Sequence, residues 1–315
     1  MEPKTGMPLL LSPQIGGENL TAWAASKRDL LTKLLLENGA ILCRGFRLDG
    51  VTDFERFIAK LSNELLDYSY RSTPRSEVSG KIYTSTEYPP DQDIPMHSEM
   101  SYTRSWPRKI WFYSVKVAES GGETPIADNR KVFQQIDPKI RQTFVDKGVM
   151  YVRNYGSGID LPWENVFQTA DRAEVEAYCR SAGIEFEWNG ETELRTRQVC
   201  QATARHPETG EEIWFNQAHL FHVSSLSPAM RDFLIEEFGE EGLPRNTYFG
   251  DHSPIEESVL DEIRQVYARN QVVFPWQEGD VLMLDNMLVA HGRRSYTGSR
   301  KVVVGMAEPW SGEAL

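Results

Sequence analysis

Cysteine and positive charge are both scarce in this chain of 315 residues. Only three cysteines occur, Cys43, Cys179 and Cys200, and their wide spacing argues against a disulfide framework and against a cysteine-based zinc site. We therefore expect reduced thiols in a cytoplasmic protein. The chain has 34 Lys and Arg against 46 Asp and Glu, a net charge of -12, and no extended basic cluster. Nucleic acid and anionic membranes are therefore not expected as partners.

Long apolar runs are also missing. The start, MEPKTGMPLLLSPQ, lacks a basic segment followed by a long apolar stretch, so we expect no signal peptide. Runs such as LLTKLLLENG are broken by charge well short of a membrane span. The composition, 40% hydrophobic and 11% aromatic, predicts a globular and sheet-rich fold instead.

Hydrophobic periodicity predicts two helices in the first quarter of the chain, four more helices after it, and strands at the end of the chain. Helices are expected over residues 22–38, 51–66, 137–149, 171–182, 228–241 and 256–269. Strands are expected in AILCRGF, KIYTSTEYPP, IWFYSVKV, GGETPIAD, MYVRNY, QVVFPW, DVLMLDN and RKVVVGM. This pattern predicts a single α+β domain over residues 1–315, with a double-layered β core and residues 150–210 as an insertion.

A metal site is the main functional hypothesis that the residues suggest. In IPMHSEMSY, His97 and Glu99 are two apart, and a strand would place both side chains on one face. A third ligand is needed to complete the two-histidine, one-carboxylate set that holds iron(II) with positions left open. His291 has the best context, because it follows the apolar strand DVLMLDNMLVA. The alternative for His291 is a core histidine bonded to the backbone.

Other histidines compete for this role. His219 and His222, in WFNQAHLFHVSS, could also bind a metal, but their surroundings suit a strand-to-loop corner near a pocket wall. His206 precedes a proline in a predicted hairpin loop, and we expect it to be an exposed turn residue. Arg300 begins the last predicted strand, where a guanidinium can bind a carboxylate with two hydrogen bonds.

Four ordered blocks resemble the TauD/TfdA-like iron(II)/2-oxoglutarate oxygenases, and more narrowly the branch of the syringomycin-type aspartyl hydroxylase. The blocks are IPMHSEMSY, GGETPIAD, WFNQAHLFH and GDVLMLDNMLVAHGRRSYTGSRKVVV. The resemblance covers about residues 30 to 310. It implies a double-stranded β-helix (jelly-roll) core with flanking helices, and iron(II), 2-oxoglutarate and dioxygen as cofactor and cosubstrates. Matched residue by residue, it implies His97, Glu99 and His291 as iron ligands, and Arg300 and Thr124 as the binding site of 2-oxoglutarate.

Two departures from the family pattern matter. The carboxylate ligand is Glu99, whereas taurine dioxygenase itself uses Asp and clavaminate synthase-like members use Glu. Arg300 also lies closer to His291 than is usual in the best-known members, which leaves Arg293 and Arg294 as weaker candidates for its role. Asp285 and Asn286 are interpreted as residues that orient the imidazole of His291, or else as a turn pair at a strand end.

The substrate is less well defined by the sequence. The branch suggests hydroxylation of an amino acid, free or tethered to a carrier protein, in specialised metabolism. The substrate-binding residues predicted near the iron are Tyr102, Arg104, Arg108, Lys109, Asn216 and His219, although core packing or a solvated surface are the alternatives for several of them. Desaturation, epoxidation or cleavage of a small acid would use the same cofactors, and a non-enzymatic jelly-roll binding protein is the alternative from another class. A homo-oligomer is left open.

Overall fold

The computed structural model describes residues 6–62, 65–66, 70, 76–85, 88–190 and 192–312. Its largest element is a seven-stranded sheet, antiparallel except for its first pair. The strands, in spatial order, are β1 (Leu9–Leu11), β2 (Ala40–Cys43), β15 (Val281–Asp285), β6 (Ser105–Lys116), β18 (Lys301–Ser311), β4 (Ile82–Thr84) and β3 (Glu77–Ser79).

A three-stranded antiparallel sheet faces this large sheet. It consists of β5 (Ile94–His97), β16 (Val289–Arg293) and β8 (Ile126–Asp128), with β16 in the middle. One buried cluster joins the two sheets, with Phe112 of β6 and Leu282 of β15 on one side and Ile126 and Val289 on the other. Two antiparallel sheets packed face to face form the double-layered β core that the sequence predicts.

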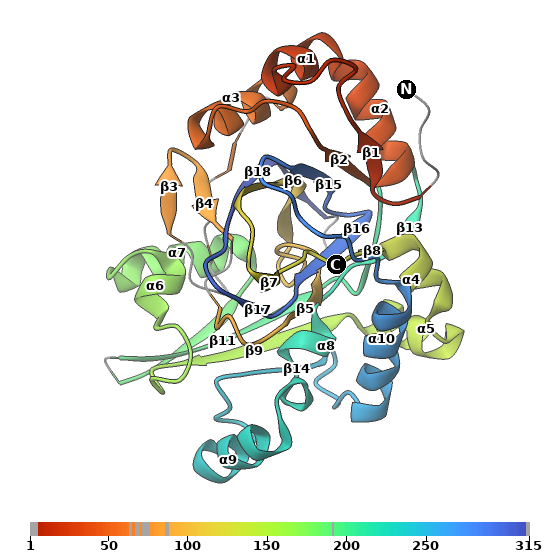
Figure 1. The fold of residues 1–315 in the computed structure, drawn as a ribbon. Coiled ribbons are helices and arrows are strands. Elements are labelled where there is room, and N and C mark those ends of the chain that lie inside the picture. Colours follow the sequence, from red (N-terminus) through yellow and green to blue (C-terminus); the bar gives the residue numbers. More distant parts are fainter. Residues whose placement is uncertain are drawn as a thin grey trace.

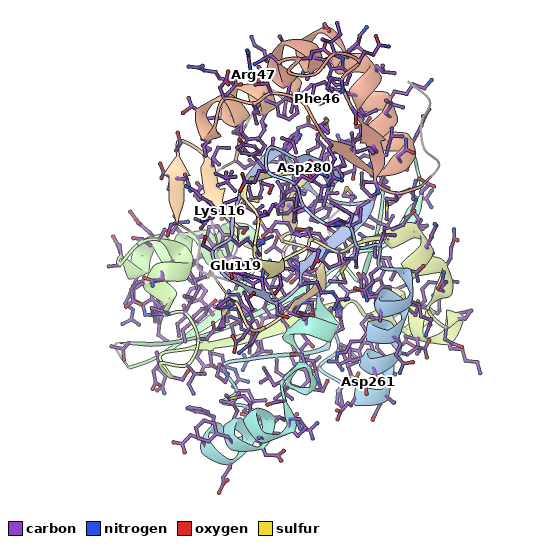
Figure 2. The ribbon with its side chains drawn as sticks, viewed as in Figure 1. Phe46, Arg47, Lys116, Glu119, Asp261 and Asp280 are labelled. Carbon is purple, nitrogen blue, oxygen red and sulfur yellow. The ribbon has the colours of Figure 1, made fainter. Side chains whose placement is uncertain are left out.

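Helices cover the outer face of the seven-stranded sheet, at the top of Figure 1. They are α1 (Leu20–Ser26), α2 (Arg28–Asn38) and α3 (Val51–Leu61). Side chains alternate along β6, so that Trp111 and Tyr113 face these helices while Ile110 and Phe112 face the inner sheet. Asp280, labelled in Figure 2, precedes β15 and accepts hydrogen bonds from Arg44 at 2.6 to 3.2 Å.

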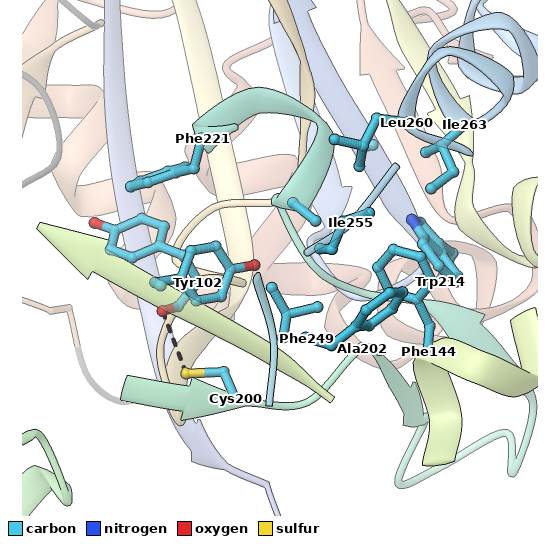
Figure 3. Close-up of a cluster of buried hydrophobic side chains, with 14 of the residues drawn as sticks. Tyr102, Phe144, Cys200, Ala202, Trp214, Phe221, Phe249, Ile255, Leu260 and Ile263 are labelled. Atoms are coloured by element: carbon cyan, nitrogen blue, oxygen red, sulfur yellow. Dashed lines mark hydrogen bonds between the residues drawn. The ribbon is translucent and has the colours of Figure 1, made fainter. Parts of the chain in front are cut away.

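A second sheet system lies on the other side of the inner sheet (Figure 1). Its four strands are β10 (Glu185–Asn189), β11 (Glu193–Cys200), β9 (Val149–Tyr155) and β14 (Arg245–Phe249). The helices of this half are α4 (Asn129–Gln135), α5 (Pro138–Lys147), α6 (Trp163–Phe167), α7 (Arg172–Ala182), α8 (Ala218–Phe221), α9 (Pro228–Phe238) and α10 (Glu257–Asn270), with a 3-10 turn, η1 (Val223–Ser225). Figure 3 shows the aromatic core of this half, in which Cys200 Sγ lies 3.4 Å from the carbonyl oxygen of Tyr102.

Two small antiparallel pairs complete the described strands. They are β12 (Thr203–Arg205) with β13 (Glu212–Trp214), and β7 (Ser120–Gly121) with β17 (Tyr296–Thr297).

The three cysteines are free and buried, and burial raises the pKa of Cys43 and Cys200 to about 12. These thiols therefore stay protonated at neutral pH. No helix among the described residues is long and apolar enough to cross a bilayer.

Most predicted elements are present, with three corrections. The helix predicted over residues 22–38 is two helices, because the chain leaves helical geometry at Lys27 (φ -125°). The segment QVVFPW is not a strand and makes only a single bridge, between Val272 and Ile126. His97 ends β5 and Glu99 lies in the turn after it, so the two residues do not share one strand. Residues 63, 64, 86 and 87, which fall within predicted elements, lie outside the described residues.

Candidate metal centre

The inner sheet brings two of the predicted ligands together. His97 and His291 are direct partners across the β5–β16 pair, and their ring centroids are 4.6 Å apart. Met96 and Ala290 point toward the aromatic core, so alternation along each strand turns His97 and His291 to the opposite face. There the ring of His291 lies 5.0 Å from that of Phe112 on the large sheet. The side-chain period of a strand therefore places both imidazoles between the two layers.

Glu99 completes the cluster from the turn that follows β5. One side-chain donor atom from each of His97, Glu99 and His291 lies within 4.8 Å of the others. Glu99 and His291 are 3% and 4% exposed, and His97 is half-buried. Two imidazoles and one carboxylate form a donor set that suits iron(II), and its three ligands leave coordination positions for other molecules. The residues present therefore fit the metal that the sequence predicts.

The imidazole of His97 is oriented by its own strand. Its Nδ1 lies 2.8 Å from the carbonyl oxygen of Pro95, to which it donates when the proton is on Nδ1. In that tautomer the lone pair is on Nε2, which is then the atom suited to a metal. A backbone carbonyl is a common partner for the second ring nitrogen of a metal-binding histidine.

Buried side chains from several elements hold the turn between β5 and β6. His219 Nε2 lies 2.9 Å from the carbonyl oxygen of Met96, and Gln217 Nε2 donates to that of Ser98 at 2.7 Å. Asn129 Nδ2 donates to Ser98 Oγ at 2.8 Å. Gln217 and Asn129 were not predicted from the sequence. Asn129 stands between Asp128 and Arg130, and Gln217 follows Asn216, so neither residue is distinguished by its local sequence.

A cavity extends from the two histidines to Arg300. It is lined by His97, His291, Thr124 and Arg300, together with Ser85, Ile94, Phe112, Gly292 and Arg293. Arg300 donates from Nε to the carbonyl oxygen of Gly122 at 2.8 Å and from NH1 to Ser85 Oγ at 3.3 Å. Its NH2 nitrogen has no hydrogen-bond partner in the described part of the chain. Burial, with the charge of Arg293 nearby, lowers the pKa of Arg300 to about 10, so it remains a cation at neutral pH.

Thr124 lies in the same cavity as Arg300. Its hydroxyl oxygen accepts a hydrogen bond from Trp276 Nε1 at 3.1 Å, so the hydroxyl proton can be donated elsewhere. A cation and a hydroxyl donor in one cavity, with metal ligands beside them, are the groups that a small dicarboxylate such as 2-oxoglutarate requires.

Arg293 and Arg294, the alternative candidates, are engaged elsewhere. Arg293 is 5% exposed and donates from NH1 to the carbonyl oxygen of Tyr88 and from NH2 to those of Pro89 and Gln92, at 2.6 to 2.9 Å. Arg294 forms an ion pair with Asp93 at 2.9 Å. Their hydrogen bonds anchor the segment of residues 88–93, which leads into β5.

The six predicted substrate residues lie outside the lining of this cavity. Tyr102 is buried among aromatic rings, Arg104 donates to the carbonyl oxygen of Val199, and Asn216 donates to that of Ala202. Arg108 pairs with Glu208, and Lys109 pairs with Glu308 at 2.7 Å. His219 contacts Met96, as described above. These positions leave the substrate roles as untested predictions.

The two rival histidines are neutral at neutral pH. Burial lowers the pKa of His219 to about 4, and it does the same for His222. His222 Nδ1 accepts a hydrogen bond from the backbone of Ser224 at the start of η1. Neither residue belongs to the cluster of His97, Glu99 and His291.

The expectation that His206 is an exposed turn residue is wrong. His206 is fully buried, and its Nε2 lies 3.1 Å from Asp285 Oδ2. Its Nδ1 accepts from the backbone of Thr209, so Nε2 carries a proton and donates to the carboxylate. Asp285 was interpreted either as a residue that orients the imidazole of His291 or as part of a turn pair at a strand end. Its carboxylate accepts from His206 and from the backbone of Met287 and Leu288, and so joins the β12–β13 hairpin to the turn after β15.

A double-layered β core, with two histidines on its inner sheet, a carboxylate in the adjoining turn and a partly buried arginine beside them, is the architecture of the iron(II)- and 2-oxoglutarate-dependent oxygenases. The comparisons with known proteins agree. The sequence model described as taurine catabolism dioxygenase TauD, TfdA family, matches residues 8–307. The chain belongs to this family, and it is an iron(II)/2-oxoglutarate-dependent dioxygenase.

Two curated relatives share most of their length with the chain. Dapdiamide synthesis protein DdaC of Enterobacter agglomerans is 43% identical over 279 residues, which cover 89% of this chain and 85% of that protein. A clavaminate synthase-like protein of Arabidopsis thaliana is 28% identical over 317 residues, covering 97% of this chain and 92% of the relative.

Solved structures share the fold at low sequence identity. PvcB from Pseudomonas aeruginosa superposes with a TM-score of 0.55 at 14% identity, covering 95% of this chain and 84% of PvcB. A taurine dioxygenase from Burkholderia xenovorans gives a TM-score of 0.52 at 17% identity, covering 96% and 88% of the two chains. The expected jelly-roll core with flanking helices is thereby confirmed.

Proposed function

We propose that the chain hydroxylates an amino acid, free or tethered to a carrier protein, with iron(II) held by His97, Glu99 and His291. The observation that carries this proposal is the convergence of the three side chains, within 4.8 Å, together with a cavity that His97, His291 and Arg300 line. The similarity to a dapdiamide synthesis protein supports a place in specialised metabolism. The free and buried cysteines agree with the cytoplasmic location that we also propose.

This proposal gives separate roles to the bound metal, to the polar residues of the cavity and to its apolar wall. Bound iron(II), with 2-oxoglutarate and dioxygen, supplies the oxidising chemistry, and succinate and carbon dioxide are the coproducts. Arg300 and Thr124 bind the far carboxylate of 2-oxoglutarate and orient it toward the metal ligands. Ile94 and Phe112 are apolar wall residues that limit access of water.

The test is to measure succinate formation from 2-oxoglutarate over a panel of amino acids, each offered free and on a carrier protein. We expect stimulation by one amino acid class, dependent on iron and dioxygen, and formation of a product 16 mass units heavier than the substrate. A product two mass units lighter would instead indicate desaturation.

The ligand assignment needs its own variants. We expect His97→Ala and His291→Ala to abolish turnover and to weaken metal binding sharply, while His222→Ala retains metal. If His219→Ala and His222→Ala lose the metal and His97→Ala does not, the assignment of the metal centre is wrong.

A further inference from the structure

We propose that Asn286 is a positioning residue that fixes Glu99 in the orientation needed for metal binding. This inference rests on the proposed role of Glu99 as a ligand. Asn286 does not contact the ligand atoms itself, and it acts through the backbone of Glu99. From the sequence it was interpreted either as a residue that orients the imidazole of His291 or as part of a turn pair at a strand end.

The side-chain amide of Asn286 holds Glu99 at two points. Its Oδ1 accepts the backbone N–H of Glu99 at 2.7 Å, and its Nδ2 donates to the carbonyl oxygen of the same residue at 2.9 Å. The same Nδ2 donates to the carbonyl oxygen of Pro107 at 2.8 Å. A primary amide is the side-chain group that offers both an acceptor and two donors. The two bonds fix the backbone on both sides of the Glu99 Cα atom, and hence the direction of its side chain.

The backbone beside Glu99 needs such support. Met100, the next residue, has φ of 57°, a left-handed conformation that is unfavourable for a residue with a side chain. Gln217 and Asn129 hold Ser98, one residue earlier, and their side chains do not reach Glu99. Asn286 therefore bonds both the backbone N–H and the backbone carbonyl of Glu99, while Gln217 bonds the Ser98 carbonyl at the other end of the preceding peptide group.

The position of Asn286 links two ligand-bearing segments. It follows β15 directly and lies in the connection to β16, which carries His291. It is fully buried, and its own backbone N–H donates to the carbonyl oxygen of Arg108 on β6 at 2.8 Å. The connection that places His291 thus also places Glu99, through a rigid attachment to the large sheet.

The test measures metal affinity in Asn286→Ala and Asn286→Asp, using cobalt(II) as the probe in the full chain. The carboxylate of the second variant would keep the acceptor for the Glu99 N–H but lose both donated bonds. We expect cobalt(II) to bind about 10- to 100-fold more weakly in both variants, the range typical for lost support of a metal ligand. We also expect the ligand-field absorption spectrum of bound cobalt(II) to change, because the carboxylate of Glu99 is no longer fixed.

A matched control separates positioning from stability. Asn246 is also buried, and it lies on β14, in a different sheet from His97 and His291; its amide accepts from the backbone of Val223 and donates to the hydroxyl of Tyr248. We expect Asn246→Ala to lower the melting temperature while leaving the cobalt(II) affinity and spectrum of the folded protein unchanged. Wild-type affinity and spectrum in both Asn286 variants, or an equal loss in Asn246→Ala, would overturn the inference.

One further variant distinguishes this inference from the proposed function. If Glu99→Ala binds cobalt(II) as tightly as the wild type, Glu99 is not a ligand, and the proposed centre fails along with the inference. If Glu99→Ala loses affinity but both Asn286 variants do not, the proposed centre stands and the role of Asn286 is rejected.

Discussion

The orientation of Arg300, in the proposed site for 2-oxoglutarate, depends on the absence of a side chain at Gly122. Gly122 has φ of 75°, and a Cβ atom there would lie 2.9 Å from Arg300 Cδ and 3.1 Å from its Nε. The carbonyl oxygen of Gly122 also accepts the hydrogen bond from that Nε. Gly122 therefore both leaves room for the guanidinium and orients it.

We predict that Gly122→Ala raises the KM for 2-oxoglutarate by about tenfold, because a displaced guanidinium misaligns the carboxylate that it binds. The control is Gly210→Ala. Gly210 has a similar φ of 71°, but no atom lies within 4 Å of the added Cβ position. Steady-state kinetics with varied 2-oxoglutarate should show the rise only for Gly122→Ala. Equal KM values in the two variants would contradict the prediction.

Arg300 and Arg293 line the same cavity but should behave differently when replaced. Arg300→Ala removes the cationic partner of a carboxylate, which costs roughly 2–5 kcal/mol, so the KM for 2-oxoglutarate should rise about 30-fold or more. Arg293→Ala removes bonds to three carbonyl groups, so it should lower the melting temperature and change this KM much less. If the two variants show the opposite pattern, Arg293 is the residue that binds the cosubstrate.

At the scale of the element, the β12–β13 hairpin is held by a buried contact that local sequence cannot reveal. The turn residues after His206 correctly predict the hairpin itself. They do not predict the depth of His206, because its partner Asp285 is 79 residues away in the sequence. The carboxylate also accepts from the backbone of Met287 and Leu288, so one buried group joins the hairpin to the β15–β16 connection.

We predict that His206→Ala lowers the free energy of unfolding by about 2–4 kcal/mol, because it leaves the buried carboxylate of Asp285 without its side-chain donor. Arg205→Ala in the same hairpin is the control. Its ion pair with Glu212 is largely exposed, so its loss should cost less than about 1 kcal/mol. Urea unfolding of both variants measures the difference, and equal losses would show that the buried contact adds nothing.

Regular elements were predictable where one face is buried and the other is not, as in α3, or where apolar residues run through a whole strand, as in β15. The segment QVVFPW has the composition of a strand, but Val272 alone forms a bridge and Val273 is 46% exposed. Composition cannot tell whether a neighbouring strand is present.

The candidate site also contains both residues that the sequence indicated and residues that it did not. The resemblance to the TauD/TfdA family implied that His97, Glu99, His291, Thr124 and Arg300 belong to one site, whereas spacing alone left the third ligand open. Asn129 and Gln217 act on a turn that is distant in sequence, and no local pattern shows such a contact.

At the scale of the whole molecule, neutral histidines that are buried or partly buried make stability depend on pH. Burial, followed by the charge of Arg264, lowers the pKa of His222 to about 4, against an ordinary value of 6.5. The unfolded chain therefore binds more protons than the folded chain between about pH 6.5 and pH 4. Stability is consequently lost as the pH falls through this window, and it is retained above it. His219 contributes with the same sign.

We predict that His222→Gln reduces the loss of unfolding free energy between pH 7 and pH 5, because glutamine cannot take up the proton. His252→Asn is the control, since His252 is exposed and its φ of 68° suits asparagine. Urea unfolding at both pH values gives the comparison. A pH dependence of His222→Gln that matches the wild type would contradict the prediction.

The anchoring of residues 88–92 has an evolutionary consequence. Arg293 donates to the carbonyl oxygens of Tyr88, Pro89 and Gln92, and the backbone N–H of Tyr296 donates to that of Pro90. Every amino acid carries a carbonyl group, so these bonds place no demand on the side chains of the segment. Mutations can therefore change the chemical character of the segment that leads into the metal centre without releasing it from the protein.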